Sequence, residues 1–113
     1  MNIYDMAHGL ARALRQHPDV LAMAEAKRKV DQDPHAKQML DDFMEKSMQL
    51  QMQEMSGAEV DEEAKSQLNK LAEIVFMHSD IREFQERAMR VERMLQDVYQ
   101  IIGKAVSPEQ SDD

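Results

Sequence analysis

The sequence has no cysteine and no tryptophan, and it has only three glycines and three prolines among 113 residues. The absence of cysteine excludes disulfides, thiolate metal sites, cysteine-ligated iron–sulfur clusters and a cysteine nucleophile. So few glycines and prolines leave few positions for turns, which favours a small number of long helices. No run of 18 apolar residues occurs, and the N-terminal segment lacks the apolar centre of a signal peptide. We therefore expect a cytoplasmic protein with no membrane span.

The residues that are present make a foldable but acidic chain. Hydrophobic residues account for 42% and charged residues for 32%, and the formal net charge is −8. The charge is uneven, because residues 31–63 carry ten acidic and two basic side chains while residues 1–30 carry three acidic and five basic ones. Such a surface repels phosphate backbones outside small patches, so we expect no nucleic-acid binding by the protein alone.

Helix start and stop signals divide the chain into five helical segments. Asn2, Asp33 followed by Pro34, and Asp61 each stand where an N-cap residue is expected. The predicted helices cover about residues 3–16, 18–30, 34–56, 62–78 and 81–103. Gly57 is placed to end the third helix. Ser79-Asp80, with Glu83 three residues after Asp80, predicts a break and a new capping box, although a kinked continuous helix would show a similar pattern.

The apolar spacing predicts how the longer helices pack. The seam of the fifth helix keeps 3-4 spacing from Ile81 to Ile102, and the third helix carries a similar seam through Phe43 and Leu50. Helices joined by a short glycine-containing loop pack antiparallel. The prediction is an all-α fold in which a long antiparallel helical hairpin, formed by the third to fifth helices, is packed by short N-terminal helices. Residues 1–105 form one helical domain, and residues 106–113 are expected to be a disordered polar tail.

No catalytic, cofactor-binding or metal-binding constellation survives a check of its spacing. The four histidines, His8, His17, His35 and His78, include no pair three or four residues apart, and none follows a glutamate by three. Asp31 and Asp33 resemble the start of a calcium loop but lack its later ligands and its glycine. Adjacent carboxylates point in different directions on a helix and so cannot converge for acid–base work. We predict no enzyme activity and no cofactor.

A methionine stripe is the one unusual feature of the third helix. Met44, Met48, Met52 and Met55 recur at 4-4-3 spacing, about 100° or more around the helix from the Phe43–Leu50 seam. Methionine suits adaptable protein contacts because it is flexible and polarizable. Thioethers can also bind Cu(I), which is a less favoured alternative. We predict that this stripe is an interface and that burying it makes a homodimer.

Several motifs, in order, resemble a known family. They are Asn2-Ile3-Tyr4-Asp5, Asp33-Pro34-x-Ala36-Lys37 with Met39-Leu40, the Gln-rich stretch from Gln49 to Gly57, and Ile101-Ile102-Gly103. Together they resemble the YlbF/YmcA-type family of small bacterial helical proteins, and within it the YheA-like branch. The resemblance implies an all-α, dimeric accessory protein of the bacterial cytoplasm, with relatives in competence, biofilm and sporulation control and in a complex connected with RNA processing. Relatives that bind iron–sulfur clusters use cysteines, which this chain lacks.

The leading hypothesis is a non-enzymatic protein-interaction module that acts as a homodimeric accessory or regulatory protein, with protein partners still to be identified. The alternative is an RNA-processing accessory factor that contacts RNA or a ribonuclease complex. Its contact would be the mildly basic segment containing Arg12, Arg15, Lys27, Arg28 and Lys29.

Overall fold

The computed structural model describes residues 2–108, which form five α-helices and no strand. The helices are α1 (Ile3–Gln16), α2 (Pro18–Gln32), α3 (Pro34–Met55), α4 (Glu62–Val75) and α5 (Ser79–Val106). The predicted all-α fold is confirmed, and every predicted helix is present. Val106 still belongs to α5, and residues 109–113 of the expected tail lie outside the described residues.

Local capping explains where most of the helices begin. The side-chain oxygen of Asn2 accepts a hydrogen bond from the backbone N–H of Tyr4 at 2.7 Å, and Asp61 accepts one from Glu63 at 3.0 Å. Asp33 accepts from both His35 and Ala36, with Pro34 at the first helical position. These three predicted N-caps are confirmed, and each satisfies backbone donors that the first turn leaves without a partner.

The start of α5 differs from the prediction. The helix begins at Ser79, so Asp80 lies inside its first turn and His78 is the cap. The His78 carbonyl accepts from Arg82 N–H at 3.0 Å, and its ring Nδ1 accepts from Asp80 N–H at 3.2 Å. The sequence rule missed this cap because an imidazole nitrogen is an unusual acceptor there. His17 caps α2 in the same way, accepting from Asp19 N–H at 3.0 Å.

By its internal contacts the chain divides into two compact units. We call Glu25–Phe84 the central unit, and we call the residues up to Ala24 together with those from Gln85 onward the terminal unit. Each unit is described by itself below.

The central unit contains a small closed core. Its buried side chains are Val30, Ala36, Leu40, Val75 and Ile81. Partly buried neighbours surround them, namely Met39, Phe43, Leu71, Phe76 and Phe84. The rings of Phe43 and Phe76 meet edge to face, with centroids 5.2 Å apart, which is a favoured aromatic geometry. The core therefore joins the end of α2, the first half of α3, the end of α4 and the start of α5.

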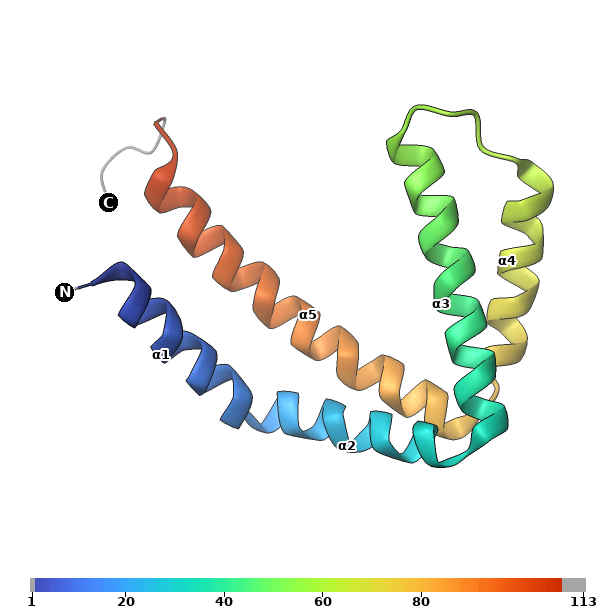
Figure 1. The fold of residues 1–113 in the computed structure, drawn as a ribbon, viewed down its shortest axis with the longest axis horizontal. Coiled ribbons are helices and arrows are strands. Elements are labelled where there is room, and N and C mark those ends of the chain that lie inside the picture. The colour runs from blue at the N-terminus through green and yellow to red at the C-terminus, as the bar shows by residue number, and fades with distance from the viewer. Residues whose placement is uncertain (1, 109–113) are drawn as a thin grey trace. The chain divides into compact units, whose positions relative to one another are not determined.

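Beyond this core, α3 and α4 extend as an antiparallel pair (Figure 1). The chain leaves α3 at Ser56 and passes through Gly57, whose φ of +80° lies in the left-handed region. Glycine adopts that conformation without a steric penalty, so it ends the helix here as predicted. The predicted hairpin is thus confirmed for α3 and α4, and α5 starts after a separate turn at residues 76–78.

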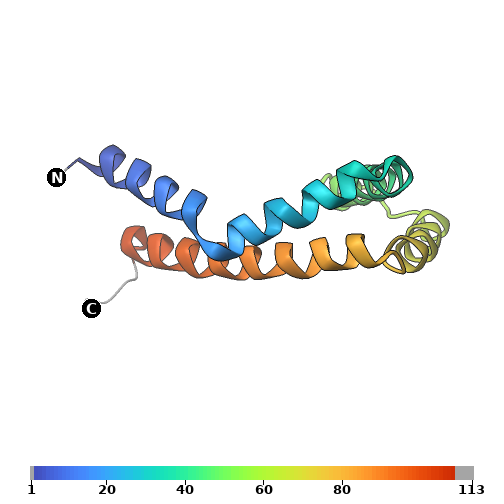
Figure 2. The ribbon, with the colours of Figure 1, turned by 90° about the horizontal axis from the view of Figure 1, so that it is seen from below.

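In the terminal unit, α1 and the C-terminal part of α5 run side by side in opposite directions (Figures 1 and 2). The beginning of α1 and the end of α5 therefore lie at the same end of this unit. Among the described residues of this unit, Val91 is the buried apolar side chain, and Leu14, Leu95 and Val98 are half-buried. No residue of α1 is buried.

Candidate protein-interaction surface

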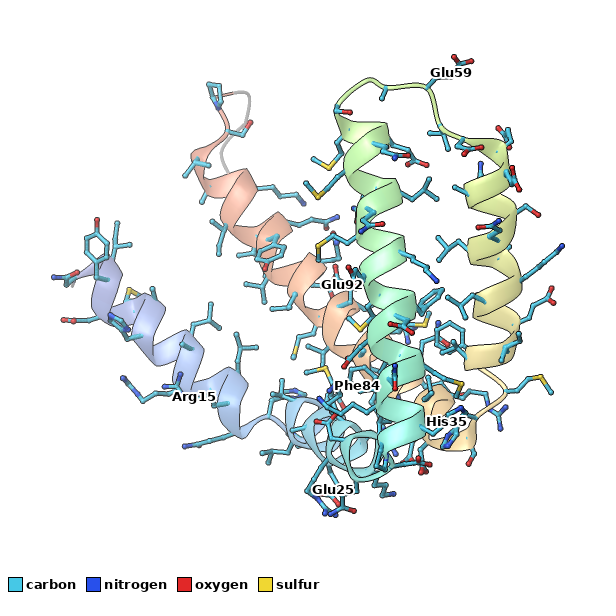
Figure 3. All side chains as sticks on the ribbon, turned by 45° about the vertical axis from the view of Figure 1, so that its right-hand side comes forward. Arg15, Glu25, His35, Glu59, Phe84 and Glu92 are labelled. Atoms are coloured by element: carbon cyan, nitrogen blue, oxygen red, sulfur yellow. The ribbon has the colours of Figure 1, made fainter. Side chains whose placement is uncertain are left out.

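The methionine stripe predicted from the sequence lies open on α3. Met44, Met48, Met52 and Met55 are between 50% and 80% exposed. Figure 3 shows sulfur-bearing side chains on the side of α3 that faces away from α4. The other seam behaves differently, because Phe43, Ser47 and Leu50 are half-buried. The two apolar faces of α3 therefore exist as predicted, and α4 covers only one of them.

Carboxylates flank the stripe. Asp41 and Glu45 lie on the same face of α3 as the stripe, and Asp42 and Glu54 lie close to it in sequence. Lys37 approaches Asp41 at 3.8 Å, and all four carboxylate-bearing residues are exposed. The negative charge at the edge of this apolar strip disfavours contact with a phosphate group or a nucleic acid.

A cavity lies between the second half of α3 and the facing side of α4. Its lining combines apolar and amide side chains, from Lys46, Gln49, Leu50, Gln53, Ala64, Gln67, Leu68 and Leu71. Lys46 is the one titratable group among these residues. The cavity therefore offers no pair of groups that could share acid–base work.

His78 links the N-termini of two helices, which the sequence alone did not reveal. Its Nε2 lies 3.2 Å from Oδ2 of Asp33, while Oδ1 of Asp33 caps α3. Because Nδ1 accepts from Asp80 N–H, the proton belongs on Nε2 and is donated to Asp33. The backbone N–H of Ala36, and then His78, hold the pKa of the Asp33 carboxyl below its ordinary value. This contact joins α3 to α5 across 45 residues of sequence.

Between residues 2 and 108, no three histidine, aspartate or glutamate side chains gather closely enough to hold a metal ion. Over the same range, no helix has the length and apolar character needed to cross a membrane.

Comparison with known proteins places the chain. Residues 3–107 match the family model described as control of competence regulator ComK, YlbF/YmcA. The chain belongs to the YlbF/YmcA family. A UPF0342 protein of Symbiobacterium thermophilum is 38% identical over 104 residues, covering 92% of this chain and 93% of the relative. One from Caldicellulosiruptor saccharolyticus is 33% identical over 105 residues, covering 93% and 88%.

A third relative is more distant but equally complete. The UPF0342 protein of Clostridium tetani is 29% identical over 106 residues, covering 94% of this chain and 91% of its own length. The resemblance to the family noted in the sequence is confirmed, while the assignment to the YheA-like branch stays a prediction.

Several residues of the family-like motifs have structural roles in this YlbF/YmcA member. Asn2 and Asp33 cap helices, and Gly57 supplies the left-handed turn. Ala36 and Leu40 are fully buried in the central core. These five motif residues therefore build the helices and their packing, and the methionine stripe of α3 stays exposed.

Proposed function

We propose that this YlbF/YmcA-family protein is a non-enzymatic, homodimeric interaction module that serves as an accessory regulatory protein in the bacterial cytoplasm. The family description, control of the competence regulator ComK, supports a role in regulation. The observation that carries the proposal is the exposure of the methionine stripe, an apolar strip that no part of the central unit covers.

Physical reasons favour a protein partner for this stripe. Contiguous exposed apolar surface is uncommon on monomers and marks contact sites. Thioether side chains adapt their shape to a facing surface. A two-fold pairing buries the same strip on both copies at once, and it is the commonest symmetry of soluble oligomers. The flanking carboxylates repel one another across such a contact, so added salt should strengthen it.

The test is the double variant Met48→Asp with Met52→Asp. We expect the wild-type protein to be a dimer by light scattering after size exclusion. The variant should dissociate more readily and keep its helical circular dichroism, because it places charge in the strip and leaves the core intact. Ser66→Asp with Asn69→Asp is a matched control, since it adds the same charge at exposed positions of α4. A wild-type protein that is monomeric at tens of micromolar contradicts the proposal.

The alternative role, direct RNA contact, has little support from the basic segment. Lys27 donates to Asp31 at 2.6 Å, and this hydrogen bond lowers the pKa of the Asp31 carboxyl. Arg28 pairs with Glu25, and Lys29 lies 3.5 Å from Glu83. Three of the five basic residues in this segment are therefore already neutralised within the chain.

We accordingly predict weak RNA binding by the purified protein. Its affinity should be no tighter than the non-specific range of roughly 10⁻⁴–10⁻⁶ M at physiological salt. Electrophoretic retardation of a labelled RNA measures this directly. Sub-micromolar retardation by the protein alone would instead favour the RNA-processing role.

A further inference from the structure

The terminal unit has an apolar seam that starts covered and ends uncovered. Along α5, Val91 is 8% exposed, Ile102 is 52% exposed and Val106 is 78% exposed. All three lie on one face of the helix. The apolar pattern of α5 therefore continues past the residues that the terminal unit itself covers.

Helix α1 shows the same gradient in the reverse chain direction. Leu14 is half-buried, Leu10 is 39% exposed and Ile3 is 79% exposed. Because α1 and α5 are antiparallel in this unit, both seams open at one end (Figures 1 and 2). We call this end the open end and define it by Ile3, Tyr4, Leu10, Tyr99, Ile102 and Val106, all of them exposed.

The charge of the terminal unit permits two copies to meet. Over residues 2–24 and 85–108 it has six Lys or Arg and five Asp or Glu, a net of +1. The central unit has eight against fourteen, a net of −6. Within the segments 2–10 and 98–106, the formally charged side chains are Asp5 and Lys104. Each copy therefore presents one carboxylate and one ammonium group, which a two-fold axis can bring together reciprocally.

We propose that the open end of the terminal unit docks on the open end of a second copy, so that α1 and α5 of both chains complete a four-helix cluster. The proposal rests on the homodimer proposed above and adds a second surface to it, besides the methionine stripe. Two pairs of antiparallel amphipathic helices form such a cluster by packing their seams together.

The decisive variant is Ile3→Asp with Ile102→Asp. It should raise the dimer dissociation constant by about 30-fold or more, the effect of losing an interface hot spot. Gln16→Asp with Gln100→Asp is the matched control, because it adds equal charge to exposed positions of the same two helices, away from their seams. The readouts are light scattering against protein concentration and circular dichroism of the same samples.

A cross-linking experiment tests the proposal even if the aspartate variant does not fold. The chain has no cysteine, so a single introduced thiol reports one position without background. Ile102→Cys should give a covalent dimer with a short bismaleimide, and Gln100→Cys, on the opposite face of α5, should give far less.

The outcomes separate this inference from the proposed homodimer. A wild-type monomer overturns both. A dimer that survives Ile3→Asp with Ile102→Asp, or one in which Ile102→Cys links no better than Gln100→Cys, overturns the open end and leaves the homodimer standing. Loss of the dimer in the Ile3/Ile102 variant with helicity retained, or efficient linking through Ile102→Cys, supports the open end.

Discussion

The central and terminal units are built from the same kind of amphipathic helix, yet only the central unit closes a core. In the central unit, seams from four helices converge and bury Val30, Leu40 and Ile81 almost completely. In the terminal unit, α1 has an apolar face as clear as any in the chain but no buried residue. An apolar seam thus shows which side chains favour burial. Whether helices of the same unit bury them depends on how many helices meet at that seam.

The charges of the two units follow the same division. The central unit has a closed core, an exposed methionine stripe and a net charge of −6, whereas the terminal unit leaves its seams open and is nearly neutral over the described residues. Negative charge beside the methionine stripe weakens self-association there, and a nearly neutral apolar surface permits it. The pattern fits a chain in which one unit is stable through its own packing and the other through assembly.

The largest effect expected is on the closed core. Leu40→Ala should lower the free energy of unfolding by about 2–5 kcal/mol, because the leucine is buried and its truncation leaves a cavity. The same change at exposed Leu10 should cost under about 1 kcal/mol when the protein is dilute enough to be monomeric. Urea melts at low protein concentration measure both. Equal losses would mean that the two units are packed equally well, which breaks the comparison.

A second prediction asks whether the units unfold together. Both tyrosines, Tyr4 and Tyr99, lie in the terminal unit, and the chain has no tryptophan. Tyrosine fluorescence therefore reports the terminal unit alone, while circular dichroism reports every helix. The prediction of one domain over residues 1–105 requires the two melting curves to coincide. Loss of the tyrosine signal before most of the helix would show that the terminal unit melts separately.

Protein concentration sharpens that measurement. If dimerisation through the open end stabilises the terminal unit, the tyrosine transition should move to higher temperature as concentration rises. A hundredfold change in protein concentration should alter the stability of a dimer by roughly a few kcal/mol. If the tyrosine transition stays at the same temperature over that range, dimerisation does not stabilise the terminal unit.

Local features could be read from the sequence, and long-range ones could not. Asn2, Asp33, Asp61 and Gly57 were assigned correctly because a cap or a left-handed turn acts on residues within one helical turn of itself. The two faces of α3 were also visible, since helical periodicity is local. The capping role of His78 and its hydrogen bond to Asp33 were missed. The two residues are 45 positions apart, and a single sequence does not show which distant residues meet in the fold. The open end was missed for the same reason, since seam spacing does not reveal where the terminal unit stops covering its own seams.

The smallest effect is expected at Asp33, which caps α3 and hydrogen-bonds to His78. Its pKa is depressed in the folded protein, chiefly by the hydrogen bond from Ala36 N–H and then by the one from His78. A group with a depressed folded pKa favours folding fully above its unfolded value, here 3.8, and loses that contribution as pH falls through the folded value. Asparagine caps a helix as well as aspartate does but carries no charge.

Asp33→Asn should therefore be less stable than the wild-type protein at neutral pH, and the gap should close as the pH is lowered below about 4, where the wild-type carboxyl also becomes neutral. Thermal melts of both proteins at a series of pH values measure the gap. Asp41→Asn is the matched control, because Asp41 is exposed and caps no helix, so its own gap should stay small and nearly flat. A gap for Asp33→Asn that is constant down to acid pH would show that the charge of Asp33 contributes nothing and that its oxygen atoms alone cap α3. The link between the two helix starts in the central unit would then depend on geometry rather than on charge.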